Sequence, residues 1–268
     1  MDHQIATLLN VTRTGAGDRT LVLCHGFGTD QTAWAAQVEA LSQNYRLVLF
    51  DLPGCGGARK EAYDQHRHAT LHGYADDLIH LCDELGIEDA IYIGHSVGGM
   101  IGCLAQAAKP SLFRALALVG ASARYLDDGD YAGGFGQADV DGIIQAMQQD
   151  YIAWASGFGE LAMANGDRPY LAQEFTRSLL AMEPDISCRM VRTIFTSDHR
   201  RDVTRVLCPA LVLQTAQDAA VPLSAAQWLA DAIPEAGLQV IEAEGHFPHI
   251  SAPDAVNNAL VRFLATVG

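Results

Sequence analysis

Short runs of apolar residues alternate along the chain with longer segments whose apolar positions recur every three or four residues. The short runs have the length of buried β-strands, and the longer segments have the periodicity of amphipathic helices. Strand-like runs lie at Thr20 to Cys24, Arg46 to Asp51, Ala90 to Ile93, Ala115 to Val119, Ala210 to Thr215 and Leu238 to Ile241, and helix-like runs at Gln31 to Ser42, Leu71 to Leu85, Met100 to Ala108 and Ala252 to Ala265. Repeated strand and helix units predict an α/β fold whose mainly parallel central sheet is flanked by helices on both faces.

The alternation is interrupted between about residues 124 and 201. Three helical segments, Val140 to Ser156, Tyr170 to Met182 and Ile186 to Thr196, follow one another there without a convincing strand. We therefore expect one α/β core, residues 1–123 and 202–268, and a helical lid insertion at residues 124–201 that gates and shapes a pocket.

The amino-terminal segment predicts an antiparallel start to the sheet. Ile5 to Arg13 reads as a strand that turns at Gly15-Ala-Gly17 into the run beginning at Thr20. The two glycines could instead form a phosphate-binding loop, but they precede a strand and open no helix, which favours the hairpin turn.

The sequence Gly94-His-Ser-Val-Gly98 lies between a strand-like run and a helix-like run. A serine hydroxyl needs a base to become a nucleophile, and a sharp strand-to-helix turn exposes its oxygen to one. Only very small residues let the backbone bend in this way, which explains Gly94 and Gly98. A chance occurrence of the motif in a glycine-rich chain is the alternative, and the strand-turn-helix context favours Ser96 as a nucleophile.

Candidates for the acid and the base follow Ser96 in the expected chain order. Asp218 comes shortly after the run Ala210 to Thr215, and His246 follows the run Leu238 to Ile241. The carboxyl ends of parallel strands meet at one edge of a sheet, so these side chains can converge on Ser96. Either residue alone would be better explained as a loop or surface residue, but the order of the three predicts a catalytic triad.

Two backbone N–H groups are expected to stabilise the negative charge that develops during acyl transfer. One is that of Val97, directly after the nucleophile, and the other is assigned to Phe27 in the segment His25-Gly-Phe-Gly28 that follows an early strand. The same segment can also be read as a tight turn, and the two interpretations are compatible.

Composition excludes several classes of function. The chain has 268 residues, 49% of them hydrophobic, and a formal net charge of -15. This acidity argues against nucleic acid or an anionic membrane as a partner. No run has the form of a signal peptide or a membrane span, so we expect a cytoplasmic protein. The six scattered cysteines read as buried thiols, and the cluster His66, His68 and His72 reads as a solvated loop rather than a metal site.

Several segments resemble the α/β-hydrolase superfamily, and in particular the RsbQ-type bacterial stress-regulator hydrolases and the plant strigolactone and karrikin receptor hydrolases. The resemblance covers essentially the whole chain, and the segments that carry it are His25-Gly-Phe-Gly-Thr-Asp-Gln-Thr-Ala-Trp34, Gly94-His-Ser-Val-Gly-Gly-Met-Ile-Gly102, Asp130-Tyr-Ala-Gly-Gly-Phe135, Tyr151-Ile-Ala-Trp154, Ser197-Asp-His-Arg200 and Gly245-His-Phe-Pro-His249. It implies the same triad, Ser96, Asp218 and His246, and the same oxyanion donors, Phe27 and Val97.

Large rings in the expected lid are candidates for the substrate pocket: Tyr125, Phe135, Trp154, Phe158 and Phe195. Each could equally belong to the core of the lid, and the resemblance favours a pocket position for Phe135, Trp154 and Phe158. Together these features predict a serine esterase or lactonase for small apolar substrates, with no metal or organic cofactor. The alternative is a small-molecule receptor whose lid contacts a regulatory protein partner and whose hydrolysis is slow.

Overall fold

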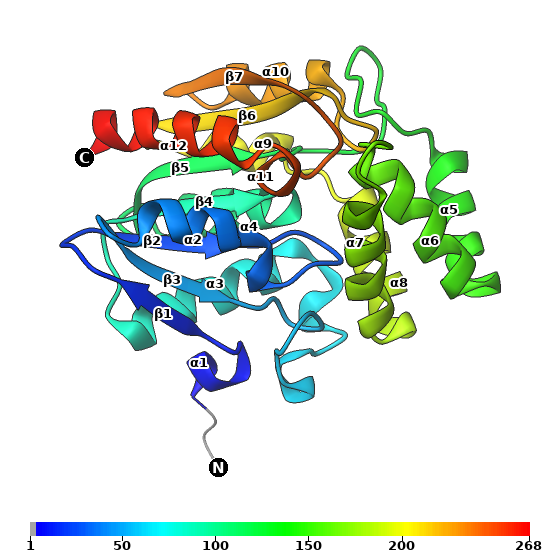
Figure 1. Cartoon of the computed structure of the whole chain (residues 1–268), viewed down its shortest axis with the longest axis horizontal. Helices are drawn as coiled ribbons and strands as arrows, with labels where there is room; N and C mark the ends of the chain where they lie inside the picture. The colour runs from blue at the N-terminus through cyan, green and yellow to red at the C-terminus, as the bar shows by residue number, and fades with distance from the viewer. Residues whose placement is uncertain (1–3) are drawn as a thin grey trace.

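The computed structural model describes residues 4–268 and has a seven-stranded sheet at its centre (Figure 1). The strand order is β1-β3-β2-β4-β5-β6-β7, and every neighbouring pair is parallel except β1 with β3. The strands are β1 Thr12–Gly15, β2 Thr20–Cys24, β3 Arg46–Phe50, β4 Ala90–His95, β5 Phe113–Val119, β6 Ala210–Gln217 and β7 Ala236–Glu244. The predicted α/β fold with a mainly parallel sheet is confirmed.

Helices cover both faces of the sheet because alternate residues of the central strands point to opposite sides. On one face Leu21, Leu23, Ile91 and Ile93 pack against α2 and α12, and on the other Val22 and other strand residues pack against α3, α4 and α10. The helices around the sheet are α1 Ile5–Leu8, α2 Ala35–Leu41, α3 Leu71–Leu85, α4 Val97–Ala108, α9 Arg200–Val203, α10 Leu223–Ala232, α11 Pro248–Ser251 and α12 Pro253–Val267, with short 3₁₀ turns at Gln31–Trp34, Lys60–Ala62 and Arg67–Ala69.

Four further helices lie between β5 and β6 in the chain and form a group of their own beside the sheet (Figure 1). They are α5 Gln137–Gln149, α6 Tyr151–Met163, α7 Pro169–Ala181 and α8 Pro184–Thr196. The two ends of this helical insertion meet, because Arg124 and Asp198 form an isolated antiparallel bridge and an ion pair of 2.6 Å. No helix within residues 4–268 is long and apolar enough to cross a membrane.

Two local predictions are wrong. Residues 5–8 form the helix α1, and β1 pairs with β3 rather than with β2, so the segment is not a hairpin with the strand that follows it. The first helix of the insertion does not run unbroken from Val140 to Ser156 either. Asp150 ends α5 and caps α6, its carboxylate accepting a hydrogen bond from the backbone N–H of Ala153; a short polar side chain with this bonding favours a helix start over a helix interior.

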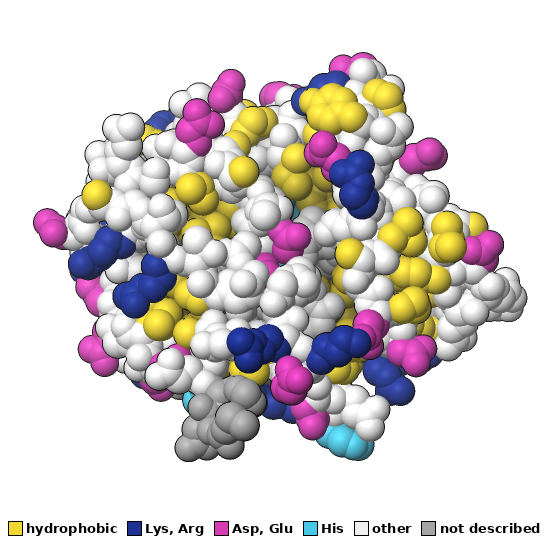
Figure 2. Space-filling view, turned by 60° about the horizontal axis from the view of Figure 1, so that its bottom comes forward, with side chains coloured by type: hydrophobic (Ala, Val, Ile, Leu, Met, Phe, Trp, Pro, Cys, Tyr) yellow, Lys and Arg dark blue, Asp and Glu magenta, His cyan; other side chains and the backbone are white. Residues whose placement is uncertain are grey.

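Residues 1–3, which the sequence analysis assigns to the core, lie outside the described residues. Within the described chain, the predicted burial of the cysteines holds for five of the six, and Cys188 is partly exposed. On the face shown in Figure 2, charged side chains of either sign are scattered, and hydrophobic atoms gather on the side where the helical insertion lies. Large exposed hydrophobic residues on α6 and α7 are Ile152, Leu161, Tyr170 and Leu180.

Candidate active site

Ser96 lies at the turn between β4 and α4, in a backbone conformation with φ 53° and ψ -123°. A non-glycine residue rarely adopts this conformation, so the surrounding structure must hold it there. The turn is very close-packed: a β-carbon at Gly98 would lie 2.4 Å from the carbonyl oxygen of His25, and one at Gly94 would lie 2.6 Å from the backbone nitrogen of Gly99. The glycines at both ends of the motif are therefore required by space, as the sequence predicts.

Ser96, His246 and Asp218 come together at the carboxyl edge of the sheet. The Ser96 Oγ and the His246 Nε2 are 2.8 Å apart, and the His246 Nδ1 and the Asp218 Oδ2 are also 2.8 Å apart. The side chains of His246 and Asp218 are 6% and 1% exposed. Both contacts have the length of good hydrogen bonds, so a proton on Ser96 has a direct acceptor and that acceptor is oriented by a carboxylate.

Asp218 is held by four hydrogen bonds in total. Its Oδ1 accepts from the backbone N–H groups of Ala220 and Val221, and its Oδ2 accepts from the Gln214 side-chain amide and from His246. Burial alone would raise the pKa of this carboxyl, but the charge of His246 and the hydrogen bonds outweigh it and leave the pKa below its ordinary value. Asp218 is therefore an anion at neutral pH.

One predicted oxyanion donor, Phe27, precedes Ser96 in the chain, and the other, Val97, follows it directly. Val97 is the first residue of α4, where backbone N–H groups have no acceptor within the helix. Phe27 lies in the segment after β2, which a bond from the Thr29 N–H to the Gly26 carbonyl closes into a turn. The interpretation of this segment as a tight turn is confirmed, and it remains compatible with the predicted role of the Phe27 N–H.

Tyr125 approaches the nucleophile more closely than the sequence suggests. Its hydroxyl oxygen lies 3.3 Å from the Ser96 Oγ, and its ring packs on Phe195 with centroids 5.0 Å apart. Burial raises the pKa of Tyr125, so the phenol keeps its proton and can donate a hydrogen bond at the reaction centre. The sequence identified this residue only as a candidate ring of the pocket.

A largely apolar cavity of about 380 Å³ lies between α5, α6 and the residues after Asp218. Four of the five predicted pocket rings line it, namely Phe135, Trp154, Phe158 and Phe195. The Trp154 and Phe158 rings stack with centroids 5.2 Å apart, and Phe158 reaches Phe27 at 6.4 Å. Small or aliphatic residues that the sequence analysis missed complete the lining: Gly142, Ile143, Ala146, Ala153, Gly157, Leu161, Ala162, Ala219 and Ala220.

Two further histidines are buried beside His246, and sequence reasoning missed them. The Nε2 of His95 lies 2.8 Å from the carbonyl oxygen of His246, so it carries the proton and donates it. The His95 ring lies 4.4 Å from that of His249, centroid to centroid. Burial lowers the pKa of His95 well below its ordinary value and that of His249 to about 3, so both rings are neutral at physiological pH.

The predicted solvated histidine cluster is only partly right. His68 is buried and contacts the Asp77 carboxylate at 2.7 Å, whereas His72 lies exposed in the first turn of α3. His72 instead approaches His199 and Asp202, and their donor atoms lie within 4.8 Å of one another, a spacing compatible with a metal ion. The His199 Nδ1 and the Asp202 Oδ2 already form a contact of 2.9 Å.

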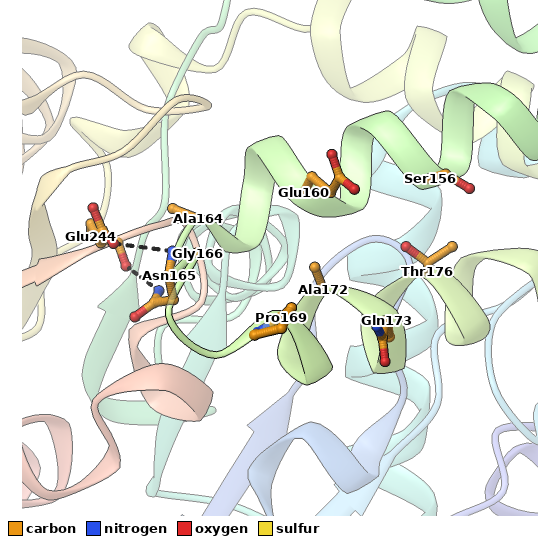
Figure 3. A pocket seen from close by; sticks show the side chains of 10 residues that line it. All are labelled: Ser156, Glu160, Ala164, Asn165, Gly166, Pro169, Ala172, Gln173, Thr176 and Glu244. Atoms are coloured by element: carbon orange, nitrogen blue, oxygen red, sulfur yellow. Dashed lines mark hydrogen bonds between the residues drawn. The ribbon is translucent and has the colours of Figure 1, made fainter.

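A larger hollow of about 680 Å³ lies between α6, α7 and the turn that joins them (Figure 3). Its lining mixes apolar and polar side chains and includes Glu160, Asn165 and Glu244, but none of the residues of the Ser96 site. The hollow also shares no lining residue with the apolar cavity between α5 and α6.

The α/β-hydrolase fold family matches residues 19–253 of the chain. The chain is 43% identical to the strigolactone esterase D14 of Arabidopsis thaliana, over 98% of each protein, and 39% identical to the karrikin insensitive 2 receptor IA of Petunia hybrida, over 98% of this chain and 96% of the receptor. A solved structure of a hydrolase from Oleispira antarctica superposes with a TM-score of 0.95 at 29% identity, covering 97% of this chain and 96% of that one.

This chain is thus a member of the α/β-hydrolase family. Within that family it is a hydrolase that resembles the plant strigolactone and karrikin receptor hydrolases.

Proposed function

We propose that the protein hydrolyses a small apolar ester or lactone through an acyl-enzyme on Ser96. The observation that carries this proposal is the continuous chain of two 2.8 Å contacts from Ser96 through His246 to the Asp218 carboxylate. A hydroxyl, an imidazole and a buried carboxylate in this arrangement are the constellation of serine hydrolases.

In the first half of the reaction His246 Nε2 takes the proton from the Ser96 hydroxyl as its oxygen attacks the substrate carbonyl. The N–H groups of Phe27 and Val97 donate to the resulting oxyanion, and the Asp218 anion stabilises the imidazolium. Collapse of the intermediate breaks the bond to the leaving alcohol, which receives the proton from His246. Water then attacks the acyl-serine while His246 Nε2 takes one of its protons. His246 returns this proton to the Ser96 oxygen as the acyl–oxygen bond breaks, which releases the carboxylic acid and restores the free serine.

The cavity supports a compact apolar substrate. Its volume of about 380 Å³ lies at the small end of ligand pockets, and stacked rings such as Trp154 and Phe158 favour apolar groups. We propose that residues 124–201 act as a lid over this cavity and that residues 1–123 and 202–268 form the hydrolase core. A lid of this kind excludes water from the reacting carbonyl.

A second function has support of its own: a small-molecule receptor that hydrolyses slowly and binds a protein partner through its lid. Relatives at 39% and 41% identity are named karrikin receptors. The exposed Ile152 and Leu161 on α6 offer apolar area for such a partner. Both functions use the same cavity, and they differ in turnover rate and in what the insertion contacts.

The experiment that tests the hydrolase is a comparison of wild type with Ser96→Ala on a short p-nitrophenyl ester. The wild type should form an acyl adduct on the peptide containing Ser96, detectable by mass spectrometry after rapid quenching. Ser96→Ala should lose the adduct and at least about a thousandfold in kcat/KM while keeping its circular dichroism spectrum. A stable adduct with little turnover would favour the receptor, and unchanged hydrolysis by Ser96→Ala would refute the role of Ser96 as nucleophile.

A further inference from the structure

The loop that carries His246 is in direct contact with the end of α6. The backbone N–H of His246 donates to the carbonyl oxygen of Ala162 at 2.7 Å. The preceding residue, Gly245, has a φ of 89°, and a β-carbon there would lie 2.2 Å from the carbonyl oxygen of Met163. Glycine is thus needed for this approach, and the main chain of the base is bonded to the helical insertion.

The turn that follows α6 has an unusual backbone. Ala164 has φ 50° and ψ -139°, and Asn165 has φ 56°. Asparagine tolerates a left-handed conformation, but the region that Ala164 occupies carries a conformational cost for alanine. Contacts around the turn must offset that cost.

Asn165 makes those contacts, and it is 6% exposed. Its backbone N–H donates to the Glu244 Oε1 at 3.1 Å, and its side-chain amide donates to the Glu244 carbonyl oxygen at 3.1 Å (Figure 3). The same amide donates to the carbonyl oxygen of Met163 at 2.8 Å. The Asn165 Oδ1 accepts a bond from Arg168, which also donates to the Ser251 carbonyl oxygen at 2.7 Å.

The two anchor points of this network, Glu244 and Ser251, lie on either side of His246 in the chain. The bonds therefore hold both flanks of the loop against the α6–α7 turn, while His95 holds the carbonyl oxygen of His246. None of the hydrogen bonds of Asn165 goes to a side chain of the triad, so any effect on the reaction must pass through the position of the loop.

We propose that Asn165 is a positioning residue for the base: its side-chain amide locks the α6–α7 turn to the His246 loop and thereby sets the distance from His246 Nε2 to Ser96 Oγ. This inference rests on the proposed role of His246 as the base. A shift of the imidazole by a fraction of an ångström is enough to slow proton transfer, because misplacement by about 1 Å can cost about a hundredfold.

The test compares Asn165→Gly with Ala164→Gly. Glycine accepts the left-handed conformation at either position, so both variants keep the turn, but only Asn165→Gly removes the amide. We expect Asn165→Gly to lose roughly tenfold in kcat on a short ester, with KM changed less than about twofold. The rate at which a fluorophosphonate labels Ser96 should fall by a similar factor. Ala164→Gly should keep wild-type kcat and labelling rate.

Titration of active sites separates positioning from a simple loss of folded protein. If Asn165 only stabilises the fold, the fraction of active sites and the melting temperature fall in Asn165→Gly, but the kcat per active site stays at the wild-type value. That result overturns the inference, as does an equal loss in Ala164→Gly. If the wild type itself is not labelled at Ser96, the proposed function fails instead.

Discussion

Acid should destabilise this protein because three histidines are buried as neutral rings around the site. His25, His95 and His249 are fully buried, and burial lowers the pKa of each, in the case of His249 to about 3. In the unfolded chain a histidine binds its proton near pH 6.5. For His249 the unfolded state therefore carries the extra proton between pH 6.5 and about 3, so the free energy of unfolding falls as the pH is lowered through this window, and His25 and His95 act in the same direction.

The magnitude for His249 follows from its pKa. At pH 5 the unfolded residue is 1.5 pH units below its pKa while the native residue is still neutral, which corresponds to a loss of about 2 kcal/mol at 1.36 kcal/mol per unit. His25 and His95 add losses of the same sign. A domain whose total stability is on the order of 5–15 kcal/mol should therefore be much easier to unfold at pH 5 than at pH 7.5.

Urea denaturation at the two pH values, followed by tryptophan fluorescence, measures this loss. His249→Phe keeps a flat ring between Trp34 and His95 and removes the titrating group, so the difference between pH 7.5 and pH 5 should shrink by about 2 kcal/mol. His80→Gln, on the exposed side of α3, is the matched control and should leave the difference unchanged. An equal difference in wild type and His249→Phe would refute the argument.

Three further predictions concern the site. Asp218→Asn should keep the fold but lose up to about ten-thousandfold in kcat, because the charge that stabilises the imidazolium is gone, whereas the exposed Asp231→Asn should keep full activity in the same esterase assay. Wild type should lose at least about tenfold in kcat/KM from butyryl to dodecanoyl esters, and Trp154→Ala should flatten that chain-length profile by opening the cavity; a wild-type optimum at long chains would contradict the closed pocket. Gly245→Ala should lower the melting temperature measured by calorimetry, since its β-carbon would meet the Met163 carbonyl oxygen at 2.2 Å; a variant as stable as wild type would show that the loop can retreat from α6 freely.

The central strands could be predicted from the sequence because they are buried on both faces. Runs such as Thr20–Cys24 and Leu71–Leu85 coincide with β2 and α3 residue for residue. The amino-terminal strand could not be placed in the same way, since all four residues of Thr12–Gly15 are exposed and burial leaves no pattern in them. Its partner, β3, follows in the chain after β2, and local turn chemistry carries no information about such a pairing.

The candidate triad was within reach of the sequence because each of its residues follows a recognisable strand. The residues around it were not, because their roles depend on contacts between distant segments. His95 reaches the carbonyl of a residue 151 positions away, and Asn165 reaches Glu244 over 79 positions. A glycine before His246 is visible in the sequence, but the helix end that requires it is visible only in three dimensions.

The way His246 is held connects the helical insertion with the chemistry. Asp218 orients the imidazole from the core, yet the main chain of the same residue is bonded to His95 in the core and to Ala162 in the insertion. Ala162 also lines the apolar cavity, so a group that fills this cavity would contact the helix end to which the His246 N–H is bonded. We therefore expect substrate binding and the position of His246 to be linked in this fold. The two proposed functions place different demands on this link. A hydrolase needs the His246 loop to stay in place during acyl transfer, whereas a receptor needs the bound ligand to displace that loop.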